Sequence, residues 1–331
     1  MRKLQERGRG PTHMQRAIGA TAVLLCCVAG APAAAVQPRI AADEIGGTVR
    51  SPRGAEAGVW VIAETHDFAT RFAKIVVTDD NGRYLIPELP RAKYSVWVRG
   101  YGLSDSVAVD ATPGRHLDLA AVVAPDAAAA AKIYPAAYWY AMMKIPEDAQ
   151  VGVVPGRRNG YLMWMKNMGC VGCHQLGNLA TRTIPKSLGT FKSSQEAWVR
   201  RLQSGQAGSQ MINIAQGVLA GIPIHYLADW TDRIEGGELP AAAPTRPSGI
   251  ERNIVATVRD WSDAKAYLHD LSGTDRRHPT VNGHGLIYGA PELSTDDFPV
   301  LDPQHNLSST CLLYTSPSPR DRTRSRMPSS A

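Results

Sequence analysis

The residues with the clearest chemistry are Cys170, Cys173 and His174, which stand together as Cys-Val-Gly-Cys-His. Two thiols at this spacing can add to the two vinyl groups of a haem, while the following imidazole reaches the iron from one face. The motif therefore predicts one covalently attached c-type haem. Cys170 and Cys173 would form its thioether bonds, and His174 would be the proximal axial ligand of the iron.

Two other uses of a Cys-x-x-Cys pair remain open from the residues alone. A thioredoxin-like dithiol needs a βαβ context and gives no reason for the His that follows the second Cys. A zinc site needs a second pair of ligands, which the chain does not offer at a suitable spacing. Haem attachment is favoured because it gives a role to all three residues.

Short helices are predicted on both sides of the motif, at 161–168, 195–203 and 224–234. The first has spaced apolar residues and would lead the chain to Cys170. Ser193 and Glu196 form a capping signature for the second, and Gly205 ends it. Pro223 suits the first turn of the third helix, and Gly236 with its neighbouring glycine ends it.

The order of elements across 156–240, a helix, the Cys-x-x-Cys-His motif, a proline loop, a helix, a methionine loop and a helix, resembles a class I c-type cytochrome domain. The resemblance implies an all-α domain that transfers electrons. It also implies that the carbonyl of Pro185 accepts a hydrogen bond from His174 and orients the ring. An ordinary loop proline is the alternative at this position.

The same resemblance implies Met211 as the distal axial ligand, because it lies in the predicted methionine loop. A thioether at that position would raise the reduction potential of the iron. His225 is the competing ligand, and an open sixth position is the third alternative. Three methionines just before the motif lie too close to it to reach the opposite face of a haem easily, and are expected in the core. They are Met163, Met165 and Met168.

The segment 45–123 is predicted to form a small all-β sandwich, because short β-branched and aromatic runs alternate with turn signals. The pair Asn81-Gly82 predicts a tight hairpin between two of these strands. The segment resembles the carboxypeptidase regulatory-like β-sandwich at 47–50, 78–84 and Leu89-Pro90, which implies an accessory or docking role. Three aromatic residues are expected in its core: Trp60, Tyr84 and Trp97.

Two linkers, 124–155 and 241–250, flank the predicted cytochrome domain. The segment 251–310 has strand signals at 253–258 and 285–288, and it resembles the incomplete start of a streptogramin-lyase-like β-propeller. Its loop histidines His269, His278 and His284 are expected to be solvated. Residues 311–331 resemble a translated sequencing adapter, and we interpret them as a disordered artefact. The predicted fold class is thus multidomain: an all-β sandwich, an all-α class I cytochrome c domain and an incomplete β segment.

Residues 1–35 are predicted to be a cleaved signal peptide, with a basic start, an apolar run and small residues at Ala33 and Ala35. An uncleaved anchor is the alternative, and Leu25 before Cys26 is a poor match to a lipoprotein site. Haem is attached through such motifs outside the cytoplasm, so the two signals together predict a periplasmic protein. The cysteine count implies no structural disulfide in the mature chain.

The net charge of +6 belongs to the two ends of the chain. Residues 1–35 hold five basic and one acidic residue, and 311–331 hold four basic and one acidic, so 36–310 carry −1. This balance gives no argument for nucleic-acid binding or, beyond the signal peptide, for membrane binding. We expect electron transfer to a redox partner protein or a quinone-linked chain, rather than catalysis. The alternatives are the N-terminal fragment of a haem-relay oxidoreductase or lyase-like enzyme with a truncated propeller, and a haem-bearing binding or sensor module.

Overall fold

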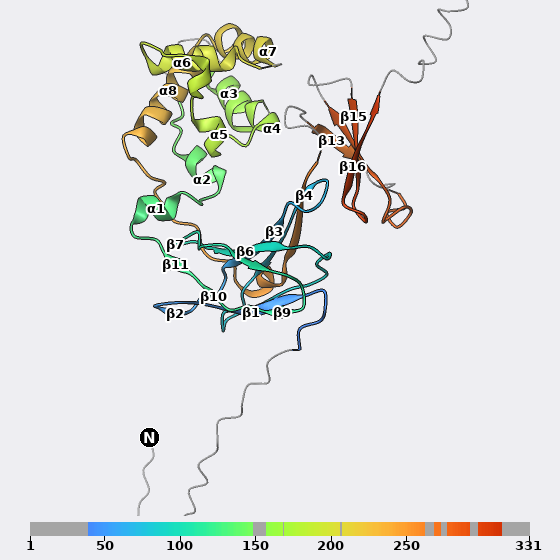
Figure 1. Cartoon of the computed structure of the whole chain (residues 1–331). Helices are drawn as coiled ribbons and strands as arrows, with labels where there is room; N and C mark the ends of the chain where they lie inside the picture. Colours follow the sequence, from blue (N-terminus) through green and yellow to red (C-terminus); the bar gives the residue numbers. More distant parts are fainter. Residues whose placement is uncertain are drawn as a thin grey trace, which may run out of the picture. The chain divides into compact units, whose positions relative to one another are not determined.

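The computed structural model describes residues 39–147, 157–167, 169–205, 207–261, 268–272, 277–291 and 297–312 (Figure 1). The predicted signal peptide, the end of the first linker and the chain beyond Leu312 lie outside these residues. The described strands form four sheets. The helices between them are short, and the longest, α8, has 14 residues.

Strands are present throughout 45–123, as predicted, and most of them belong to two five-stranded sheets. In the first sheet the central strand β1 pairs with all four others, which are β2, β5, β9 and β10. The second sheet has the order β12-β4-β3-β6-β8. The bounds of the first sheet are β1 (Ile45–Ser51), β2 (Gly54–Ala55), β5 (Arg83–Ile86), β9 (Arg115–His116) and β10 (Leu119–Ala120). Those of the second are β3 (Trp60–Thr65), β4 (Arg71–Val77), β6 (Tyr94–Arg99), β8 (Val109–Ala111) and β12 (Val255–Asp260).

A hydrophobic core draws its side chains from both of these sheets. Ile45 and Ile86 come from the first sheet, and Val61 and Val96 from the second; all four are fully buried. The alternation of buried and exposed residues along β5 is the period-two pattern of a strand with one face on a core. Of the aromatic residues expected there, Tyr84 is buried, whereas Trp60 and Trp97 are only half-buried.

The Asn81-Gly82 turn is present, but the predicted hairpin is wrong. Gly82 has a φ of +72°, and the Asp79 carboxylate accepts the backbone N–H groups of Asn81 and Arg83, each at 2.8 Å. The strands on either side of this turn lie in different sheets, since β5 pairs with β1 in a register that sets Ile45 opposite Ile86. The hydrogen bonds of the turn can form whether the flanking strands pair with each other or lie in different sheets. Which strands pair is decided by the face that each strand buries.

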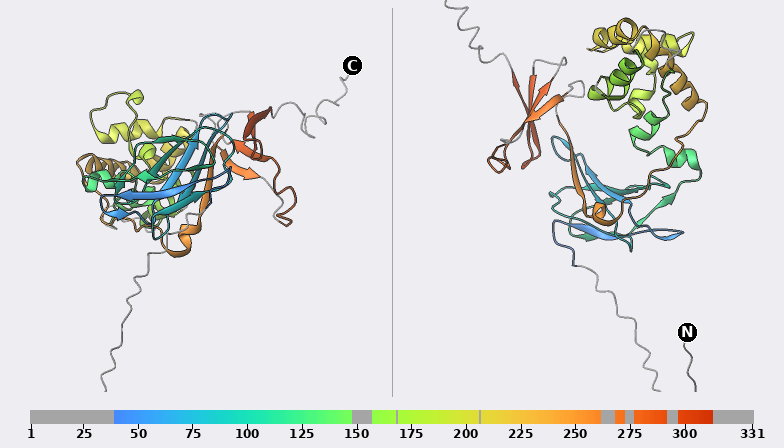
Figure 2. Two further views of the ribbon diagram at one scale, coloured as in Figure 1. Left: turned by 60° about the horizontal axis from the view of Figure 1, so that its bottom comes forward. Right: turned by 180° about the vertical axis from the view of Figure 1, so that it is seen from behind.

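Strand β12 also differs from its predicted place. The sequence assigns 253–258 to the C-terminal segment, whereas β12 pairs antiparallel with β4 over six residue pairs, from Val255 opposite Val76 to Asp260 opposite Arg71. In Figures 1 and 2 this strand, drawn in orange, runs beside β4. The chain therefore leaves the first β segment after β11 (Val122–Val123), which pairs with β7 (Leu103–Ser104), and returns to it at β12.

Arg246, in the predicted linker 241–250, binds to the β segment 45–123. Its guanidinium lies 2.6 Å from the carboxylate of Glu56, a side chain that is only 5 % exposed. The same guanidinium donates hydrogen bonds to the carbonyls of Tyr101 at 2.9 Å and Ala57 at 3.1 Å. A buried carboxylate is thus matched by a cation that arrives from a distant part of the sequence, which fixes the chain just before β12.

The C-terminal described strands form a four-stranded sheet in which each strand pairs antiparallel with the next. They are β13 (Leu268–Ser272), β14 (Ile287–Pro291), β15 (Asp297–Asp302) and β16 (Leu307–Leu312). His278 and His284 are exposed, as expected, and the side chain of His269 lies outside the described part. The resemblance of this sheet to a propeller blade stays a prediction.

The predicted fold class is wrong in one main respect, because the chain does not form a distinct all-α cytochrome c domain. The described chain has many strands in several sheets, its helices are short, and the described residues from Ile40 onward belong to one unit. The helices are α1 (Ala127–Ala131), α2 (Ala136–Ala141), α3 (Arg157–Leu162), η1 (Met163–Asn167), α4 (Cys170–Cys173), α5 (Leu179–Arg182), η2 (Lys186–Leu188), α6 (Ser194–Leu202), α7 (Gly208–Ile212), η3 (Asn213–Val218), α8 (Ile222–Glu235) and η4 (Gly249–Asn253). Capping signals set the ends of individual helices but not how those helices are grouped with the sheets.

Within the described residues, no helix alone is long and apolar enough to cross a membrane. The bent pair Gly208–Val218 and Ile222–Glu235, with an angle of 106° between its parts, meets that test only when the two are taken together.

Replacing Arg246 by Ala should destabilise the protein by about 3 kcal/mol, because it leaves the buried Glu56 carboxylate without its cation. We place the value at the lower end of the usual range because the Arg246 side chain is still 29 % exposed. The matched control is Arg252→Ala, whose partner Asp80 is 86 % exposed and whose ion pair should contribute less than about 1 kcal/mol. Urea unfolding of the two variants measures the difference, and equal midpoints would contradict the role of Arg246.

Candidate functional site

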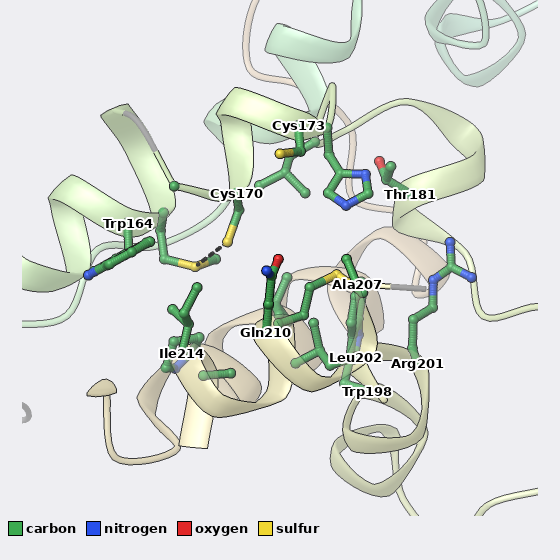
Figure 3. A pocket seen from close by; sticks show the side chains of 18 of the residues that line it. Trp164, Cys170, Cys173, Thr181, Trp198, Arg201, Leu202, Ala207, Gln210 and Ile214 are labelled. Atoms are coloured by element: carbon green, nitrogen blue, oxygen red, sulfur yellow. Dashed lines mark hydrogen bonds between the residues drawn. The ribbon is translucent and has the colours of Figure 1, made fainter. Parts of the chain in front are cut away.

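A cavity of about 490 Å³ lies among the short helices, and its lining includes predicted site residues. Cys170, Cys173, His174 and Met211 all line it. Most of the remaining lining is apolar, and the volume lies within the usual range of cofactor sites, about 300–1,000 Å³. Figure 3 shows Cys170 and Cys173 on the side of the cavity opposite Gln210 and Ala207.

The motif is positioned by a tight turn after the π-helical segment η1. A Cβ on Gly169 would lie 2.5 Å from the backbone oxygen and the ring of Trp164, so the turn needs a glycine here. Helix α4 then places Cys170 and Cys173 one turn apart, and its last hydrogen bond runs from the His174 N–H to the Cys170 carbonyl at 2.9 Å. His174 itself is extended, with φ −125° and ψ 137°, so it leaves the helix.

Helices α6 and α7 form much of the facing wall. The Ser193 side chain accepts the backbone N–H of Glu196, as the capping signature predicts, and α6 presents Trp198 to the cavity. The Trp198 indole N–H donates to the Thr231 hydroxyl of α8 at 3.0 Å. The wall formed by α6 is therefore joined to α8 by a specific hydrogen bond.

Helix α8 holds the other wall through aromatic packing. Tyr161 of α3 and Trp230 of α8 are both fully buried. The Tyr161 ring lies 5.6 Å from the ring of Tyr226, in an edge-to-face arrangement. The Trp230 indole N–H donates to the Trp139 carbonyl of α2 at 2.8 Å. Met165, predicted in the core, is buried in this cluster, and its sulfur lies 3.6 Å from that of Cys170. The same prediction is wrong for Met163, which is 42 % exposed, and Met168 lies outside the described residues.

The predicted loop around Met211 is wrong, because Met211 lies on helix α7. The chain reverses tightly after α6: a Cβ on Gly208 would lie 2.4 Å from the Gln203 carbonyl oxygen. A new helix begins directly after this turn and continues into the π-helical segment η3. π-helical turns are frequent at functional sites, and here both of them, η1 and η3, contribute lining residues.

The structure does not bring His225 or Pro185 to the cavity. His225 is exposed and lines a separate groove, where its Nδ1 lies 3.5 Å from the side-chain nitrogen of Gln195. The Pro185 carbonyl accepts the backbone N–H of Leu188 at 3.0 Å, which opens η2. The motif and Met211 thus line the same cavity, whereas the competing ligand His225 and the expected orienting residue Pro185 do not line it.

The electrostatics of the cavity differ from those of a thiol–disulfide catalyst. Burial raises the pKa of the Cys170 thiol, with a smaller contribution from Cys173. A thioredoxin-like site needs the opposite, a thiolate stabilised by a lowered pKa. Burial and the positive charge of Arg201 lower the pKa of His174, so that its imidazole is neutral at pH 7. The neutral imidazole is the form that binds a metal ion.

Arg201 is a lining residue that sequence reasoning missed. It lies three positions after Trp198 on α6, so both side chains are on the same face of the helix. An arginine on the apolar face of a predicted amphipathic helix is the signal that could have singled it out.

In the described part of the chain, no three His, Cys, Asp or Glu side chains gather at a point where they could hold a metal ion.

Comparison with known proteins leaves the resemblances as predictions. No protein-family model and no curated protein matches the chain. One solved structure, a type II cohesin–X-dockerin complex from Acetivibrio cellulolyticus, aligns with a TM-score of 0.19 and 17 % identity over 24 % of this chain. The chain spans 58 % of that protein's length. A TM-score this low assigns neither a fold nor a function.

The two motif thiols should differ in reactivity in protein isolated without a cofactor. Cys173 is exposed, whereas Cys170 is partly buried and has a raised pKa, so less of it is thiolate at pH 8. We expect alkylation by iodoacetamide to be at least about tenfold slower at Cys170. Its rate should keep rising above pH 9, since its pKa lies above the ordinary value of 9.0.

Mass spectrometry of timed, digested samples measures both rates, and Cys311→Ala removes the remaining thiol of the described chain. Faster alkylation at Cys170 than at Cys173 would indicate an activated thiol and favour the thioredoxin-like alternative.

Proposed function

We propose that the chain carries one covalently attached c-type haem and transfers electrons through it. The observation that carries this proposal is the convergence of Cys170, Cys173, His174 and Met211 on one mainly apolar cavity. These are the residue types that attach such a haem and ligate its iron from two sides. When bound, the haem supplies a one-electron couple, and the polypeptide sets its potential and its accessibility.

Each residue has a distinct role in this proposal. Cys170 and Cys173 would hold the porphyrin through thioethers, because α4 places both thiols within one turn of helix. His174 offers a neutral ring nitrogen to the iron. Met211, on α7, would supply a thioether sulfur as the second ligand of the iron, which would raise the reduction potential. Trp164 and Trp198 line the cavity and would shield a porphyrin there from water.

The predicted export signal places this chemistry outside the cytoplasm, in the periplasm of a Gram-negative cell. The electrons would be exchanged with a redox partner protein or a quinone-linked chain. The basic start of the chain belongs to the predicted signal peptide, and residues 36–310 carry a net charge of −1, so we propose no nucleic-acid partner.

Covalent attachment should depend on both motif thiols. Protein exported to a periplasm that attaches haem should keep its haem after denaturation, because thioether bonds survive unfolding. Cys170→Ala and Cys173→Ala should each reduce the retained haem at least about tenfold, whereas Cys311→Ala, which removes a thiol that does not belong to the motif, should leave it unchanged. A haem stain on denaturing gels and the intact mass measure the result. Wild-type protein without covalent haem would overturn the proposed function.

The distal ligand is tested by a pair of substitutions. Met211→Ala should abolish the sulfur-to-iron absorption band and lower the reduction potential, because it removes the thioether proposed as the second ligand of the iron. His225→Ala should change neither, since His225 lines a different groove. Absorption spectra and potentiometric titration of the oxidised proteins decide the matter. The reverse pattern would assign His225, and no change in either variant would indicate an open sixth position.

A further inference from the structure

Arg201 is the one charged side chain, His174 aside, among the described residues that line the cavity. In Figure 3 it lies at the edge of the cavity nearest Thr181, on the same side as Leu202. Its neighbour Arg200, by contrast, is exposed and lines the separate groove that also contains His225. Two adjacent arginines on α6 are therefore directed into different surroundings.

The positive charge of the Arg201 guanidinium is not balanced by a negative charge within the described protein. Its Nη2 donates to the Ala180 carbonyl at 2.7 Å, and no carboxylate of the described residues forms an ion pair with it. Arg233 and Arg246, which are also partly buried, both have carboxylate partners within 3.0 Å. Removing a cation from water without an anionic partner is costly, so such a group in a cavity wall marks a place for an anion.

The planar guanidinium determines what kind of anion fits. Its fork of N–H donors matches the two oxygens of a carboxylate, and one nitrogen that is held by Ala180 leaves other donors for the cavity. A haem carries two propionate carboxylates on the ring edge away from its vinyl groups. We propose that Arg201 binds a carboxylate of the cofactor held by Cys170 and Cys173, and so fixes the orientation of the ring in the cavity.

This inference rests on the proposed function and adds an electrostatic role to it. Removing the cation would leave the carboxylate charge uncompensated close to the iron. An uncompensated negative charge stabilises the oxidised iron, which has one more positive charge than the reduced form. The reduction potential should therefore fall when Arg201 loses its charge.

The test uses three variants of the haem-loaded protein. Arg201→Gln keeps an amide donor for the Ala180 carbonyl and loses the charge; Arg201→Lys keeps the charge and loses the fork. Arg200→Gln is the matched control, because it makes the same change in net charge at the neighbouring position outside the cavity. Reduction potentials are measured by redox titration at low and high salt.

For Arg201→Gln we expect the equilibrium constant for reduction to fall about tenfold, which is about 59 mV for one electron. The fall should persist at high salt, because pairs inside a cavity are screened much less than surface charges. Arg201→Lys should lie between the wild type and Arg201→Gln. Arg200→Gln should cause a smaller change that disappears at high salt.

An Arg201→Gln shift that equals that of Arg200→Gln, or disappears at high salt, would overturn the inference. If Arg201→Gln yields no loaded protein, Arg201→Lys decides: a lowered, salt-resistant potential supports the pair, and an unchanged potential overturns it. These outcomes are distinct from failure of the proposed function, in which the wild type itself retains no covalent haem.

Discussion

The packing of α8 is the interaction on which the candidate site depends. Its buried aromatic face contacts α3 through Tyr226 and α2 through Trp230, and its Thr231 hydroxyl accepts the indole N–H of Trp198 on α6. The motif follows α3, and the opposite wall of the cavity begins at α6. Since α8 contacts both α3 and α6, it helps to position both walls. Short helices have little stability of their own in water, which makes this tertiary burial their main support. A change in the α8 face would therefore alter the shape of the cavity as well as the stability of the fold.

The cavity combines apolar burial with very little charge. Burial raises the pKa of Cys170 and lowers that of His174, so both groups are neutral near pH 7. These directions suit residues that form covalent and coordinate bonds to a cofactor, and they disfavour thiolate chemistry. Arg201 is the exception, because it brings a positive charge to the same wall. A single cation in such surroundings acts strongly on any charge that changes nearby, since the screening by water is weak there.

The topology explains why the helices and the strands do not separate into independent parts. The chain leaves the first β segment after β11 and returns as β12, which adds to the edge of the sheet beside β4. Arg246 secures that return through the buried carboxylate of Glu56. Residues that are more than a hundred positions apart in the sequence thus complete one sheet. The segment that contains the cavity helices is therefore connected through the chain, at both of its ends, to the same β structure.

The sequence by itself determined the local features. It located the Cys170–His174 motif, the cap at Ser193, the ends of α8 to within a residue or two of Pro223 and Gly236, and the strands of 45–123, because each depends on residues close in the chain. Only the tertiary structure decided that β12 pairs with β4, that the strands beside Asn81-Gly82 separate into two sheets, and that no distinct all-α domain forms. It also decided that Met211 faces the motif cavity while His225 does not, and that Arg201 shares that cavity. These outcomes depend on which faces are buried together, and burial between distant segments leaves no periodic or spacing signal in the sequence.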